Sequence, residues 1–187
     1  MQPAKNDEKR YTYADYCTWG DDVHCELIDG VVYDMSPAPG WVHQEVSGSI
    51  FLQLGNYLDG KQCKVFHAPF DVRLNASEND DTVVQPDIVV ICDISTIGGT
   101  GCTGAPDMVI EVLSPSTASK DMILKYNKYL EAGIREYWIV DPQTKTVRVC
   151  ILNNGKYDSI DYMDARIIPI RVLDGCDIDI ERVFRTV

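Results

Sequence analysis

Two acidic residues stand at the ends of short apolar segments. Asp87 follows Pro86 at the start of the apolar run 88–91, and Glu111 directly follows Met108-Val109-Ile110. These segments are too short for helices, so both carboxylates are expected on neighbouring strands of one sheet. Paired carboxylates suit a hard divalent cation such as Mg²⁺, which prefers oxygen ligands and takes only one or two from the protein. The working hypothesis is metal-dependent phosphodiester chemistry. Taken alone, these two residues favour the alternative, in which both acids mark strand ends and face solvent.

Phosphodiester hydrolysis also needs a positive charge that stabilises the transition state. The position two residues after Glu111 holds Leu113, so this charge must come from elsewhere in the chain. On the helix expected next, Lys125 falls on the flank of the buried stripe, whereas two other lysines point farther from the sheet. The stripe consists of Met122, Tyr126, Tyr129 and Leu130, and the other lysines are Lys120 and Lys128. Helix geometry supports Lys125 equally as the site cation or as the surface partner of Asp121 at i,i+4.

The elements that must position these side chains alternate between strands and helices. The pattern predicts a hairpin that turns at Asp29-Gly30, helices over 43–58 and 118–132, and strands over 63–67, 70–74, 83–92, 107–113 and 136–140. Pro86 inside 83–92 indicates an edge strand or a local irregularity. The strand, helix and strand over 107–140 form a βαβ unit, which normally gives a parallel pair. The expected class is therefore α/β (α+β), with a central mixed sheet flanked by helices.

Composition favours one domain. The chain has 187 residues, which we divide into a flexible tail over 1–10 and a single domain over 11–187. No apolar stretch approaches the ~20 residues that span a membrane, and the polar N-terminus has no signal-peptide core, so a cytoplasmic protein is expected. The seven cysteines are widely spaced without a CxxC pair, and they are interpreted as reduced, mostly buried thiols.

Net charge limits the ways in which this chain would bind nucleic acid. The chain carries 17 basic and 29 acidic residues, a formal net charge of −12. This balance counts against broad electrostatic attachment to nucleic acid, whose affinity comes largely from Lys and Arg. A basic groove on an acidic body, or the charge of a bound metal, would offset it locally.

Several motifs occur in a characteristic order along the chain. They are Glu26-Leu27-Ile28-Asp29-Gly30, Met35-Ser36-Pro37-Ala38-Pro39 followed by His43-Gln44, Val84-Gln85-Pro86-Asp87, Gly104-Ala105-Pro106-Asp107, Glu111-Val112-Leu113-Ser114-Pro115-Ser116, and Glu136-Tyr137-Trp138-Ile139-Val140-Asp141-Pro142. Together with Asp121, Lys125, Tyr129 and Gly133, they resemble the Uma family of putative restriction endonucleases. The resemblance covers nearly the whole chain beyond the tail.

The resemblance implies a restriction-endonuclease-like fold of the PD-(D/E)xK superfamily. It implies that Asp87 and Glu111 are metal ligands, joined by the backbone carbonyl of Val112. The lysine of the motif would stand at position 113, where this chain has Leu113. In the family this lysine is displaced to the helix, which agrees with Lys125.

The resemblance also implies supporting positions around the metal or the phosphate at Glu26, His43 and Gln85. Each of these residues has a structural alternative. Glu26 suits the role of polar partner in an alternating strand, and His43 suits a capping or packing role at a helix start. Gln85 suits hydrogen bonds to backbone groups beside Pro86. Four aromatic residues are assigned to the core by their strand and helix patterns: Tyr126, Tyr129, Tyr137 and Trp138.

These observations lead to one functional hypothesis and two rivals. We expect a DNA endonuclease that uses Mg²⁺ or Mn²⁺, in which Asp87 and Glu111 hold the metal and Lys125 orients water or neutralises charge. The first rival is an inactive nuclease-fold module that binds a protein or nucleic-acid partner, and the second is a hydrolase of small phosphate esters. A homodimer is expected because a duplex has two strands to cut.

Overall fold

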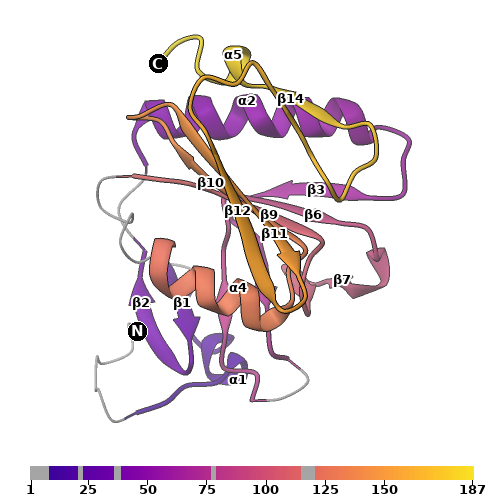
Figure 1. Ribbon diagram of the computed structural model, residues 1–187. Helices are drawn as coiled ribbons and strands as arrows, with labels where there is room; N and C mark the ends of the chain where they lie inside the picture. The colour runs from indigo at the N-terminus through magenta and orange to yellow at the C-terminus, as the bar shows by residue number, and fades with distance from the viewer. Residues whose placement is uncertain (1–8, 21–22, 36–38, 77–78, 115–120) are drawn as a thin grey trace.

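The computed structural model describes residues 9–20, 23–35, 39–76, 79–114 and 121–187, without the side chains of 121 and 122 (Figure 1). Most of the expected tail over 1–10 and the expected helix start at 118–120 lie outside these residues. In the described ranges, no helix is both long and apolar enough to cross a membrane.

A six-stranded mixed sheet forms the centre of the protein, as expected. Its order is β12 (Lys156–Tyr162), β11 (Thr146–Asn153), β10 (Glu136–Asp141), β9 (Met108–Val112), β6 (Ile88–Ile91) and β3 (Lys64–His67). Strands β9 and β10 are parallel, so the predicted βαβ unit is confirmed, and the other pairs are antiparallel. All five residues of β9 are buried, which explains its nearly continuous apolar sequence.

A second six-stranded sheet lies beside the first. Its order is β2 (Val31–Asp34), β1 (Cys25–Ile28), β5 (Val83–Val84), β4 (Asp71–Arg73), β8 (Gly101–Thr103) and β7 (Ile97–Gly98). The hairpin between β1 and β2 turns at Asp29 and Gly30, with φ of 51° and 73°, as the Asp-Gly pair predicts. The prediction of one strand over 83–92 is wrong, because β5 belongs to this second sheet and β6 to the central one. Pro86 stands at the break, where its missing N–H costs no ladder hydrogen bond.

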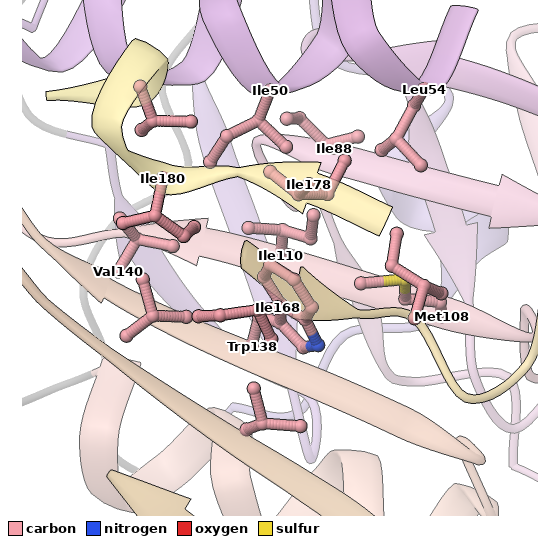
Figure 2. Close-up of a cluster of buried hydrophobic side chains, with 14 of the residues drawn as sticks. Ile50, Leu54, Ile88, Met108, Ile110, Trp138, Val140, Ile168, Ile178 and Ile180 are labelled. Atoms are coloured by element: carbon pink, nitrogen blue, oxygen red, sulfur yellow. The ribbon is translucent and has the colours of Figure 1, made fainter. Parts of the chain in front are cut away.

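The helices cover opposite faces of the central sheet. Helix α2 (Trp41–Leu58) and helix α5 (Ile180–Val183) lie on one face with the small sheet of β13 (Ile167–Pro169) and β14 (Asp177–Asp179) (Figure 1). Figure 2 shows Ile50 and Leu54 of α2 beside Ile88, Ile110 and other side chains of this core. On the other face, α4 (Tyr126–Ala132) contributes to a core shared by both sheets (Figure 1). The short elements α1 (Tyr13–Tyr16) and η1 (Ile94–Thr96) complete the described helices together with η2 (Asp121–Lys125).

The helix before β10 differs from its expected geometry. Residues Asp121–Lys125 form a π-helical turn, and only Tyr126–Ala132 are α-helical. Gly133 ends the helix with φ of 82°, as the sequence predicts. Single π-helical turns in helices often occur at functional sites, and Lys125 lies in this turn.

The cysteines correct one expectation. Cys63 and Cys92 form a disulfide, so the interpretation of all seven as reduced thiols is wrong. The pairing follows from the register of β3 and β6, in which Lys64 stands opposite Ile91 and the next pair outward is Cys63 and Cys92. Four of the other five cysteines are buried, as expected, and Cys17 is exposed.

The close approach of β4 and β8 generates a test of the fold. A Cβ added at Gly101 would lie 1.8 Å from the backbone oxygen of Asp71, so Gly101→Ala must push the strands apart. We expect Gly101→Ala to lower the free energy of unfolding by about 1–3 kcal/mol or more, the range for overpacking. The control is Gly48→Ala on α2, where nothing lies within 4 Å. This control should stabilise the protein by about 0.5–1 kcal/mol, and urea midpoints that are equal for the two variants would contradict the described packing.

Candidate functional site

Asp87 and Glu111 lie on neighbouring strands of one sheet, as the sequence predicts. In the antiparallel pair of β6 and β9, Ile88 stands opposite Ile110, so the next positions along are Asp87 and Glu111. The backbone N–H of Val112 donates a hydrogen bond of 2.7 Å to Asp87 Oδ2. The Asp87 side chain is 20% exposed and the Glu111 side chain only 4%, so the alternative of two solvent-facing acids is wrong for Glu111. The pair forms a partly open carboxylate site at one end of the sheet.

Lys125 reaches this carboxylate site from the π-helical turn. Its Nζ lies 2.9 Å from Glu111 Oε1 and 2.7 Å from Glu26 Oε1, and its side chain is 5% exposed. The expectation that Lys125 leans over the sheet is confirmed in position. The side chain of Asp121, the alternative partner, lies outside the described residues. One buried ammonium therefore joins a carboxylate of the second sheet to a carboxylate of the central sheet.

Tyr129 was assigned to the core, and it is fully buried, but its hydroxyl also belongs to the site. This hydroxyl donates a hydrogen bond of 2.6 Å to Glu111 Oε1, the oxygen that also faces Lys125. Burial, and then the charge of Glu111, raises the pKa of Tyr129 well above its ordinary value. Tyr129 therefore keeps its proton and acts as a donor. The available sequence signal was its place one helical turn after Lys125, on the same helix face.

Glu26 contacts the site, whereas the Gln85 side chain points away from it. Glu26 Oε1 accepts a hydrogen bond of 2.9 Å from the backbone N–H of Gln85 as well as the contact with Lys125. The Gln85 side chain instead donates to Asp71 Oδ1 at 2.8 Å and to the Tyr16 hydroxyl at 3.2 Å. Glu26 thus lies at the site, and Gln85 contributes its backbone. The sequence analysis considered hydrogen bonds from Gln85 to backbone groups beside Pro86. The Gln85 side chain instead binds the side chains of Asp71 and Tyr16.

His43 approaches Asp87 from α2, on the other side of the central sheet from α4. The helix begins at Trp41, two residues before the predicted start, so His43 lies in its first turn. Its Nε2 lies 3.2 Å from Asp87 Oδ2. The expected nearness of His43 to the site is therefore observed, and the contact is with a carboxylate that the sequence assigned to the metal.

The donor set of the site fits a hard divalent cation. Among the described side chains, Glu26 and Glu111 contact the Lys125 ammonium, and Asp87 stands beside Glu111 on the adjacent strand, so three carboxylates gather around one lysine. The described part of the chain has no group of three His, Cys, Asp or Glu residues arranged to hold a metal ion. Asp87 and Glu111 would offer a cation oxygen ligands, and the cation would complete its shell with water or substrate oxygen atoms, as Mg²⁺ does.

Asp71 was missed by the sequence analysis. It lies on β4 and is 8% exposed, although its segment gave only an expected strand. The available signal was an acidic residue between Phe70 and Val72 in the strand-like run 70–74. Its carboxylate accepts hydrogen bonds from Gln85, Tyr16 and Thr100.

Comparisons with known proteins give a family and a fold. The model of the Uma2 family, described as "Putative restriction endonuclease", matches residues 11–181. The crystal structure of a putative nuclease belonging to DUF820 from Anabaena variabilis is 18% identical with a TM-score of 0.76, covering 94% of this chain and 98% of that chain. This likeness confirms the expected mixed α+β fold.

A curated relative from Synechocystis sp., the uncharacterized protein slr1290, is 30% identical over 104 residues. The match covers 56% of this chain and 53% of the relative. This chain therefore aligns with about half the length of that relative.

The buried ion pair generates a stability prediction. Lys125→Met leaves the carboxylates of Glu26 and Glu111 buried without their shared cation, so we expect it to lower the free energy of unfolding by about 3–5 kcal/mol. The matched control is Lys128→Met on the same helix, because Lys128 pairs with the exposed carboxylates of Asp29 and Glu131. This control should cost less than about 1 kcal/mol. Equal urea midpoints for the two variants would show that the buried pair does not stabilise the fold.

Proposed function

Because this chain belongs to the Uma2 family, whose description is "Putative restriction endonuclease", we propose that it is a metal-dependent endonuclease that hydrolyses DNA phosphodiester bonds. The observation that supports this proposal best is the contact of 2.9 Å between Lys125 Nζ and Glu111 Oε1, beside Asp87 on the adjacent strand. Two strand carboxylates can hold a metal ion, and an ammonium can stabilise the charge that develops on the phosphate during hydrolysis. Position 113 is a leucine, and the ammonium is supplied instead by Lys125 in the π-helical turn.

In this proposal, Asp87, Glu111 and the backbone carbonyl of Val112 hold Mg²⁺ or Mn²⁺. Such a cation, when bound, polarises a phosphoryl oxygen and lowers the pKa of an attacking water. Asp87 is oriented for this role by the Val112 N–H, which donates to Oδ2 at 2.7 Å, and by His43, whose Nε2 lies 3.2 Å from the same oxygen. Partners of this kind hold a ligand in one orientation and limit its loss of entropy on binding.

Lys125 performs the second part of the proposed reaction. Glu26 and Glu111 hold its ammonium in one place, so little reorganisation is needed when charge develops on the phosphate. From there it donates a hydrogen bond to the attacking water or to a phosphoryl oxygen. Tyr129 holds Glu111 from the core side through its hydroxyl.

The acidic composition bears on how DNA would be bound. At a net charge of −12, and with Lys125 already paired with Glu26 and Glu111, attraction to phosphate would come largely from the bound cation. DNA binding should therefore depend strongly on the divalent cation.

A plasmid-nicking assay tests the proposed reaction. Asp87→Asn keeps the size of the side chain but removes a charged metal ligand, so nicking with Mg²⁺ or Mn²⁺ should fall by more than about 100-fold, the upper range for residues that only support a ligand. The control is Asp93→Asn, which changes an exposed acid beyond the opposite end of β6. Asparagine caps helices as well as aspartate does, so this variant should retain wild-type nicking.

Retention of wild-type nicking by Asp87→Asn would refute the assignment of Asp87. Loss of nicking in both variants would point to a general effect of removing negative charge. Thermal unfolding of each variant, measured in parallel, separates lost chemistry from lost structure.

A second candidate is a nuclease-fold module that binds a partner without cleavage. The burial of Glu111 favours it, because Glu111 Oε1 already accepts from Lys125 and Tyr129. A calorimetric titration with Mn²⁺ discriminates between the two functions. The endonuclease should show saturable binding that Asp87→Asn weakens about 10-fold or more, whereas no binding by wild type, together with no retention on DNA at low salt, would favour the module.

A further inference from the structure

A buried polar cluster beside the site carries an inference of its own. Asp71 of β4 accepts three hydrogen bonds from side chains: Gln85 Nε2 at 2.8 Å and the Tyr16 hydroxyl at 3.2 Å reach Oδ1, and Thr100 Oγ1 at 3.0 Å reaches Oδ2. All three donors are neutral groups. Burying an ionised carboxylate is costly unless hydrogen bonds replace its water, and bonds to an ionised acceptor are stronger than those to a neutral one. Asp71 therefore ties Gln85, Tyr16 and Thr100 together through its two oxygen atoms.

Tyr16 remains a donor in this cluster. Burial, and then the charge of Asp71, raises the pKa of the Tyr16 hydroxyl. The hydroxyl is therefore protonated at neutral pH. Because Tyr16 Oη also accepts from Gln85 Nε2, it closes a three-membered ring of hydrogen bonds with Asp71 and Gln85.

Gln85 is held at two points, and both matter to the site. Its side chain binds Asp71, while its backbone N–H binds Glu26 Oε1 at 2.9 Å. The same Glu26 oxygen lies 2.7 Å from Lys125 Nζ. Asp87 follows two residues later, after Pro86, whose ring restricts the backbone between them. A shift of Gln85 would therefore move the Lys125 pair and Asp87 together.

We propose that Asp71 is a positioning residue, which holds Gln85 and thereby fixes Lys125 and Asp87 in the geometry that hydrolysis needs. The inference rests on the proposed function. Asp71 acts through Gln85 and does not touch the substrate. Its removal should therefore lower kcat and leave KM unchanged, because a small misplacement of reacting groups costs rate.

The experiment compares four variants in the nicking assay with Mn²⁺. Asp71→Ala removes the acceptor, and Gln85→Leu removes the donor and serves where Asp71→Ala does not fold. Both should lower kcat about 10- to 100-fold at unchanged KM. Asp71→Asn keeps an oxygen for Gln85 and should restore kcat. Thr100→Val removes a hydrogen bond to the other oxygen of the same carboxylate and should keep wild-type kcat.

Amide hydrogen exchange measured by NMR provides a readout that does not depend on activity. The amide at position 85 should exchange about tenfold faster in Asp71→Ala and in Gln85→Leu, and at the wild-type rate in Thr100→Val. The amide of Val149 on β11 should keep its rate in all variants, because this strand lies in the central sheet and away from β4. Faster exchange at both positions would indicate general destabilisation and would overturn the proposal.

The other outcomes also decide the question. Wild-type kcat in both Asp71→Ala and Gln85→Leu would overturn the inference, and so would an equal loss of kcat in Thr100→Val. If wild-type protein does not nick DNA, the proposed function fails. Amide exchange at position 85 still tests whether Asp71 holds Gln85 in place. Faster exchange in Asp71→Ala supports that contact, and an unchanged rate overturns the inference.

Discussion

The buried ammonium of Lys125 is the interaction on which the rest of the site depends. It lies 2.7 Å from Glu26 of the second sheet and 2.9 Å from Glu111 of the central sheet, so one cation joins the two sheets. Without this ammonium, the carboxylates of Glu26 and Glu111 would be buried with no positive charge beside them. An uncompensated buried charge strongly destabilises a fold. Glu26 and the Tyr129 hydroxyl together fix the positions of Lys125 and Glu111. The fold and the proposed chemistry therefore share the same charged contact.

The position of Asp87 is set where the chain passes from the second sheet to the central sheet. Strand β5 ends at Val84 in the second sheet and β6 begins at Ile88 in the central sheet. The link is Gln85-Pro86-Asp87, and each of its residues has a distinct contribution. Gln85 is anchored by its side chain and its N–H, Pro86 lacks the N–H that a continued ladder would use, and Asp87 accepts from the Val112 N–H. An apolar strand end thus becomes the edge of a polar site.

The two cores explain why this polar cluster is tolerated in a small protein. Apolar side chains fill the space between the central sheet and α2 on one face (Figure 2), and they form a second core with both sheets and α4 on the other. The charged groups gather where β6 begins and β9 ends, and Asp87 remains partly exposed there. Water or a substrate oxygen has access to Asp87, while the low exposure of Lys125 strengthens its electrostatic contacts.

Some of this arrangement is contained in the sequence by itself. Short apolar runs with acids at their ends placed Asp87 and Glu111 on neighbouring strands, and Asp29-Gly30 determined a hairpin turn, because both signals are local. Helical periodicity brought Lys125 to the flank of the sheet but did not distinguish a site cation from a surface pair; family resemblance favoured the site. Only the tertiary structure decided that 83–92 divides between two sheets, that Glu26 shares Lys125 with Glu111, that Asp71 holds Gln85, and that Cys63 bonds Cys92. These contacts join segments far apart in the chain, and local patterns do not specify which distant segments pair.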